Sequence, residues 1–147
     1  MNRCFKSRGL AACAAAFVVS ATLTSCSSGP PETTANAEVG QSTPMRVGVG
    51  QFATLAESRD IQVVDVRTPD EFASGHIAGA VNIPVQSPDF AERVDDLDPS
   101  ATYAVYCRSG NRSQPAVAAM HSAGIDRIYE LSSGTRGWVS AGRQLVQ

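Results

Sequence analysis

One short segment of the chain has the residue types and the spacing of a nucleophilic site. It reads Cys107-Arg108-Ser109-Gly110-Asn111-Arg112-Ser113. A thiol reacts as its thiolate, which nearby cations and backbone N–H groups stabilise. Gly110 permits a tight turn whose N–H groups point inward, and Arg108 and Arg112 add permanent positive charge. The segment therefore predicts that Cys107 is a nucleophile with a lowered pKa and that the other six residues form its loop.

The pattern around this segment predicts the elements that hold it. Five short, mostly apolar runs are typical of strands buried on both faces: 45–49, 61–66, 80–83, 103–106 and 128–131. Helices are expected between them, at 51–58, 69–74, 89–97, from Ser113 to about Gly124, and around Trp138. Thr68, Pro69 and Glu71 have the spacing of a helix-capping box.

This alternation predicts an α/β fold with an open, mainly parallel sheet and helices on both faces. Cys107 directly follows a predicted strand and precedes a predicted helix. In such sheets, ligands bind beyond the carboxyl ends of the strands, so the loop stands where chemistry is expected.

The N-terminal residues have the pattern of an export signal. Arg3, Lys6 and Arg8 precede sixteen uncharged residues, a run shorter than a spanning helix requires. The run ends in Leu23-Thr24-Ser25-Cys26, which resembles the lipobox of bacterial lipoproteins. That resemblance implies cleavage before Cys26 and a lipid on its sulfur; the alternative is an ordinary signal peptide with a chance cysteine. We therefore expect a lipid-anchored protein on the extracytoplasmic side of the cell membrane.

Three regions follow from this division. Residues 1–25 are the expected signal peptide, residues 26–44 the lipidated cysteine with a flexible tether rich in Ser, Thr, Pro and Gly, and residues 45–147 the folded domain. Loss of the signal leaves 9 basic and 14 acidic residues, a net charge near −5, which argues against nucleic-acid binding.

Cysteine usage singles out Cys107. Of the four cysteines, Cys4 and Cys13 lie in the signal and Cys26 would carry lipid, so Cys107 is the only free thiol left. The competing interpretation is an inert, buried cysteine, because free cysteines are commonly buried. The two histidines are not spaced with Cys107 as metal ligands, and we expect no metal or other cofactor.

Three segments, in order, carry a family resemblance. The first is Val64-Asp65-Val66-Arg67-Thr68-Pro69-Asp70-Glu71-Phe72 with Gly75-His76-Ile77-Ala78-Gly79-Ala80-Val81-Asn82-Ile83-Pro84; the second is the Cys107 loop; the third runs from Leu131 to Trp138. Together they resemble the rhodanese-like sulfurtransferases over about residues 45–140. One departure stands in the third segment, where the family usually has paired glycines and this chain has Ser132-Ser133-Gly134.

The resemblance implies a mechanism and its partners. Cys107 would take the outer sulfur of a small anionic donor such as thiosulfate, become a persulfide, and pass the sulfur to a thiol or to cyanide. The resemblance also implies supporting roles for Asp65 and Arg67. Arg108 is expected either to meet the anionic donor or to be solvated, Arg112 to brace the loop, and Ser113 to cap the following helix. We expect a monomer.

Two other functions remain open from the sequence. Single rhodanese-like domains also act as sulfur carriers or docking modules with negligible turnover. Related phosphatases and arsenate reductases have five residues between the cysteine and the arginine. Here four residues separate Cys107 from Arg112, and this shorter loop favours sulfur over a tetrahedral oxyanion.

Overall fold

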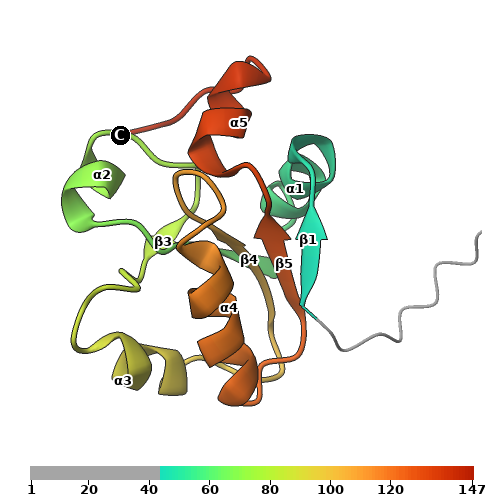
Figure 1. The fold of residues 1–147 in the computed structure, drawn as a ribbon. Coiled ribbons are helices and arrows are strands. Elements are labelled where there is room, and N and C mark those ends of the chain that lie inside the picture. Colours follow the sequence, from blue (N-terminus) through green and yellow to red (C-terminus); the bar gives the residue numbers. More distant parts are fainter. Residues whose placement is uncertain (1–43) are drawn as a thin grey trace, which may run out of the picture. The chain divides into compact units, whose positions relative to one another are not determined.

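The computed structural model describes residues 44–147 (Figure 1). The predicted signal peptide, Cys26 and most of the tether lie outside the described residues. Ten elements alternate along the chain: β1 (Met45–Val47), α1 (Val49–Ala56), β2 (Ile61–Asp65), α2 (Pro69–Ala73), β3 (Val81–Asn82), α3 (Phe90–Asp95), β4 (Thr102–Tyr106), α4 (Ser113–Ser122), β5 (Ile128–Leu131) and α5 (Gly134–Ser140).

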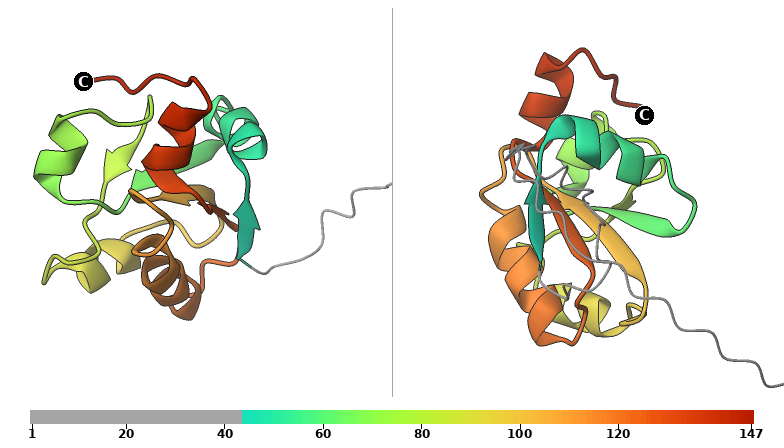
Figure 2. Two further views of the ribbon diagram at one scale, coloured as in Figure 1. Left: turned by 45° about the horizontal axis from the view of Figure 1, so that its top comes forward. Right: turned by 90° about the vertical axis from the view of Figure 1, so that its right-hand side faces the viewer.

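The strands form one sheet in the order β1-β5-β4-β2-β3, and every neighbouring pair is parallel. The longest pairing joins β2 to β4, where Ile61 is opposite Thr102 and Asp65 is opposite Tyr106. Helices cover both sides of the sheet (Figure 2). The predicted α/β class with a parallel sheet and helices on both faces is therefore confirmed.

Two buried clusters lie on the two faces, because successive strand residues point to opposite sides. On β4, Tyr103 and Val105 belong to one cluster, and Ala104 and Tyr106 to the other. The first cluster is covered by α3 and α4 through Phe90, Val94, Ala116, Val117 and Met120. The second is covered by α1 and α5 through Phe52, Ala53 and Trp138.

The strand order places a topological switch point between β2 and β4. After β2 the chain moves outward to β3, whereas after β4 it moves the other way to β5. The connections that follow these two central strands therefore diverge, which leaves room at their carboxyl ends. Cys107 directly follows β4, and Asp65 is the last residue of β2, so these two predicted site residues lie at this edge.

Several predicted boundaries were wrong: the helix expected at 51–58 runs from Val49 to Ala56, and the helix expected at 89–97 runs from Phe90 to Asp95. The expected strand 45–49 ends at Val47, and α1 already begins at Val49, after an extended Gly48 at its N-cap. The expected strand 80–83 narrows to Val81–Asn82. Pro84, which has no N–H to donate, closes that strand. Within residues 44–147, none of the helices has the length and apolar character needed to cross a membrane.

Candidate active site

Cys107 lies under its loop, between β4 and α4. Its residue surface is 0% exposed. The Gly110 N–H donates to Sγ at 3.1 Å, and the Ser113 hydroxyl oxygen is 3.5 Å from Sγ. Gly110 has a φ of +85°, in the left-handed region that glycine favours. The predicted turn at Gly110 is confirmed, and it directs a backbone N–H toward the sulfur.

The surroundings of the sulfur favour its ionised form. Burial by itself would raise the pKa of the Cys107 thiol. A hydrogen bond with the Ser113 hydroxyl and hydrogen bonds from the backbone N–H groups of Ser109, Ser113 and Gly110 outweigh burial, so the pKa is lowered from its usual value. An inert buried cysteine would have only apolar neighbours and a raised pKa. Cys107 is buried, but donors surround its sulfur.

The loop rests against the start of α5. The N–H groups of Thr135 and Arg136 donate to the carbonyl oxygens of Cys107 and Arg108 at 2.9 and 3.1 Å. Gly134 has a φ of +58°, and a Cβ there would overlap the Cys107 carbonyl. Ser133 has a φ of −101°, which any residue can adopt. The departure from paired glycines is therefore tolerated: Gly134 is the position whose backbone requires glycine.

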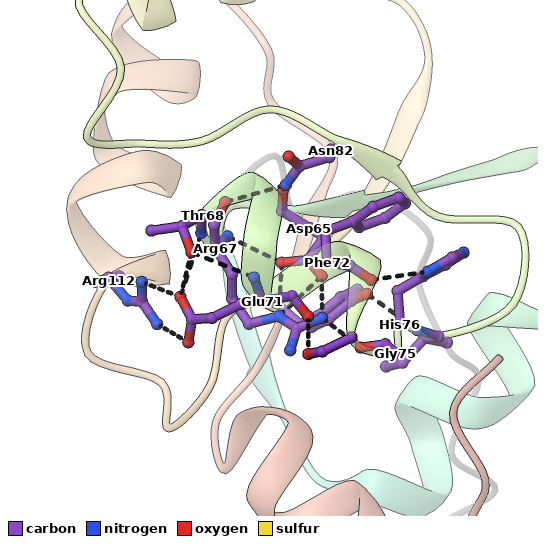
Figure 3. Close-up of polar contacts among 12 residues, drawn as sticks. Asp65, Arg67, Thr68, Glu71, Phe72, Gly75, His76, Asn82 and Arg112 are labelled. Carbon is purple, nitrogen blue, oxygen red and sulfur yellow. Dashed lines mark hydrogen bonds and ion pairs between the residues drawn. The ribbon is translucent and has the colours of Figure 1, made fainter. Parts of the chain in front are cut away.

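Asp65 and Arg67 form a buried ion pair beside the loop (Figure 3). Arg67 donates to both Asp65 carboxylate oxygens and to the Gly75 carbonyl, at 2.6–3.0 Å. The Arg67 backbone N–H also donates to Asp65 Oδ1. Burial opposes the Arg67 charge, but the Asp65 carboxylate outweighs it and raises the pKa of Arg67. This pair joins the end of β2 to the turn after α2.

Arg112 donates to Glu71 on α2, and the two make a bidentate pair with distances of 2.6 and 2.8 Å (Figure 3). Glu71 also completes the predicted capping box with Thr68, which is confirmed. The Arg112 guanidinium holds the pKa of Glu71 well below its usual value, at about 2. The pair ties the last loop residue to the neighbouring helix.

The remaining loop residues have different surroundings. Arg108 and Asn111 are exposed, and Ser109 is half-buried. The Arg108 side chain makes no hydrogen bond or ion pair with any other residue in 44–147. Its permanent charge is therefore available to an anion arriving from solvent.

Ser113 does not cap α4, which corrects the sequence prediction. The N-cap position belongs to Arg112 and has no side-chain hydrogen bond, and Ser113 is the first helical residue. Its hydroxyl is fully buried and donates to Glu130 Oε1 at 2.6 Å. The hydroxyl points inward, toward β5 and Cys107, because the first turn of α4 packs against the sheet.

Sequence reasoning missed Glu130 and Arg46. Glu130 lies on β5 and is 2% exposed, and its Oε2 accepts from Arg46 Nε at 2.7 Å. A signal was present: Glu130 is the only charged residue of a strand expected to be buried on both faces, and a buried charge needs a partner. Among residues 44–147, no group of three or more His, Cys, Asp and Glu is arranged to hold a metal ion.

Comparison with known proteins decides the family. The family model described as the rhodanese-like domain matches residues 49–141 of this chain. These residues include every site residue described above except Arg46. This chain belongs to the rhodanese-like family. The rhodanese-like match ends within one residue of the end of α5, so it contains all the elements of the described fold except β1.

Relatives with assigned names are similar over the same region. A sulfurtransferase of Allochromatium vinosum is 34% identical over 92 residues, covering 63% of this chain and 84% of the relative. The thiosulfate sulfurtransferase GlpE of Shewanella oneidensis is 30% identical over 95 residues, covering 65% and 92%. The crystal structure of a rhodanese-related protein from Thermoplasma volcanium matches with a TM-score of 0.62 and 29% identity, covering 69% of this chain and 97% of that one.

Proposed function

We propose that this rhodanese-like domain is a thiosulfate-type sulfurtransferase that carries sulfur as a persulfide on Cys107. The observation that carries the proposal is the polar surrounding of Cys107 Sγ, to which the Gly110 N–H donates at 3.1 Å and beside which the Ser113 hydroxyl lies at 3.5 Å. Relatives at 30–34% identity are named sulfurtransferases, one of them for thiosulfate. Four residues between Cys107 and Arg112 also favour sulfur over oxyanion chemistry.

The reaction would proceed in two displacements. In the first, the Cys107 thiolate attacks the outer sulfur of thiosulfate, a new S–S bond forms, and sulfite leaves with the electron pair of the broken S–S bond. In the second, cyanide or a thiolate attacks the terminal persulfide sulfur, and Cys107 leaves as a thiolate. Donors that stabilise the thiolate assist its departure in the second step, since a thiol of lower pKa leaves faster. Arg108 supplies positive charge for the incoming anion.

The direct test measures both halves of the reaction. The purified protein is incubated with thiosulfate, intact mass spectrometry should detect the gain of one sulfur atom, and peptide mapping should place that atom on the peptide that holds Cys107. Addition of cyanide should then remove it and release thiocyanate. Cys107→Ser should abolish both signals, and Ser109→Ala serves as a mild loop control. Absence of both products from the unaltered protein would disprove the proposal.

Two alternatives give different results in the same assays. A sulfur carrier or docking module would form the persulfide stoichiometrically but turn over negligibly with cyanide. It would pass sulfur only to one co-purifying protein. A phosphatase or arsenate reductase would hydrolyse a phosphoester or reduce arsenate without gaining sulfur.

We further propose that the chain is lipid-anchored through Cys26 on the extracytoplasmic side of the membrane. The support is the sequence Leu23-Thr24-Ser25-Cys26 after a charged start and an apolar run. Expression in a bacterial host with labelled palmitate should label the protein and place it in the membrane fraction. Cys26→Ser should lose the label; unchanged membrane association of that variant would contradict the anchor.

A further inference from the structure

A chain of four side chains leads from the surface of β1 to the candidate nucleophile. Arg46 Nε is 2.7 Å from Glu130 Oε2, Ser113 Oγ is 2.6 Å from Glu130 Oε1, and Ser113 Oγ is 3.5 Å from Cys107 Sγ. Arg46 and Glu130 are register partners on β1 and β5. The Arg46 side chain is 52% exposed and the Glu130 side chain only 3%. These four side chains thus connect the solvent-exposed surface with the buried site.

Ser113 lies in the middle of this series of side chains, and Glu130 and the Cys107 sulfur compete for its hydroxyl proton. A serine hydroxyl has one proton to donate. Ser113 donates it to Glu130, so in this arrangement Ser113 can only accept from a Cys107 thiol. A Cys107 thiolate has no proton, and the Ser113 hydroxyl must turn away from Glu130 to stabilise it. A carboxylate is a strong acceptor, and it holds that proton the more tightly when its own charge is poorly neutralised.

We propose that Glu130 is a positioning residue for Cys107: it competes with the Cys107 sulfur for the Ser113 proton, and Arg46 limits that competition by neutralising Glu130. Besides the Asp65–Arg67 pair at the end of β2, the charged groups around the site come from three elements and from the Cys107 loop. Glu130 belongs to β5 and Arg46 to β1, whereas Arg112 precedes α4 and pairs with Glu71 of α2. Arg112 has the opposite charge to Glu130 and attracts the Cys107 thiolate.

The inference rests on the proposed function only for its effect on turnover. In that reaction a lower thiol pKa makes Cys107 a better leaving group in the second displacement and a weaker nucleophile in the first. The protonation of Cys107 itself is measurable without any sulfur donor. Failure of the sulfurtransferase assay and failure of this inference are therefore separate results.

The experiment measures the rate of iodoacetamide labelling of the Cys107 peptide as a function of pH, in the full chain, by mass spectrometry. Glu130→Gln removes the charge and weakens the acceptor, so the pKa of Cys107 should fall by about one unit. Arg46→Gln leaves Glu130 without its counter-ion, so the pKa of Cys107 should rise by about half a unit. Arg46→Lys keeps the positive charge, so its Cys107 pKa should stay close to that of the unaltered protein. Arg127→Gln, an exposed arginine before the same strand β5, is the matched control and should change nothing.

A second pair of variants tests whether Ser113 transmits the effect. Ser113→Ala should raise the pKa of Cys107, and Glu130→Gln made in that background should shift it less than in the unaltered protein. Opposite shifts for Glu130→Gln and Arg46→Gln, with this loss of coupling, support the inference. Shifts of the same sign, no shifts, or a Glu130→Gln effect that persists without Ser113 overturn it. Arg46 is half-exposed on an edge strand, so its variants keep the test decisive should Glu130→Gln fail to fold.

Discussion

Two arginine–carboxylate pairs flank the Cys107 loop, and they differ in their access to water. The side chains of Asp65 and Arg67 are 0% and 6% exposed, whereas those of Glu71 and Arg112 are 29% and 27% exposed. The first pair is two residues apart in sequence and the second is forty-one apart. Removing one partner of a buried pair leaves a charge without water, whereas removing one partner of a partly exposed pair does not. We infer that the buried pair maintains the fold and the exposed pair positions the loop.

The largest expected effect lies in the buried pair. Arg67→Met should lower the free energy of unfolding by about 3–5 kcal/mol, because it leaves the Asp65 carboxylate buried and uncompensated. Urea unfolding followed by circular dichroism measures this change. Arg127→Met, at an exposed position, is the control and should change stability by less than about 0.5 kcal/mol. A further change of Asp65 to Leu should recover part of the loss, and no recovery would contradict the assignment.

A smaller effect, on activity, is expected at the exposed pair. Arg112→Gln should reduce thiosulfate:cyanide transfer about tenfold because the loop loses its tie to α2. Its stability should fall by less than about 1 kcal/mol. Glu71→Gln is the matched variant, since it breaks the tie but keeps the Arg112 charge near Cys107. Equal losses of transfer activity in both variants would indicate that the Arg112–Glu71 pair positions the loop. A loss in Arg112→Gln alone would mean that the Arg112 charge matters instead, and would contradict the positioning role inferred for the exposed pair.

The smallest effect is the pH dependence of stability from Glu71. The pKa of Glu71 is lowered from 4.5 to about 2, so the folded state binds its proton less readily than the unfolded state. The contribution to stability is fully present above about pH 4.5 and is lost as the pH falls toward 2. Exposure limits it to about 1 kcal/mol or less. In urea unfolding at several pH values, the free energies of unfolding of the unaltered protein and of Glu71→Gln should converge as the pH falls. A difference that stays constant with pH would contradict this prediction.

Local patterns predicted much of the fold and part of the site. Buried apolar runs separated by helix signals indicated the parallel sheet, and Gly110 indicated the turn over Cys107. These features depend on neighbouring residues alone. The pairing of Arg112 with Glu71 and of Ser113 with Glu130 joins residues distant in sequence, which no local pattern specifies. Serine commonly caps helices, which predicts a cap at Ser113. In the structure α4 already begins at Ser113, and the Ser113 hydroxyl donates to the buried Glu130 carboxylate.

The shortness of the outer strands has a consequence for how the protein behaves when crowded. β1 and β3 lie at the two edges of the sheet and have three and two residues. An edge strand is a template on which another chain can add by backbone hydrogen bonding, and brief edges offer few donors and acceptors for that. We expect the native sheet to resist edge-to-edge growth, so that β-aggregation has to start from unfolded molecules.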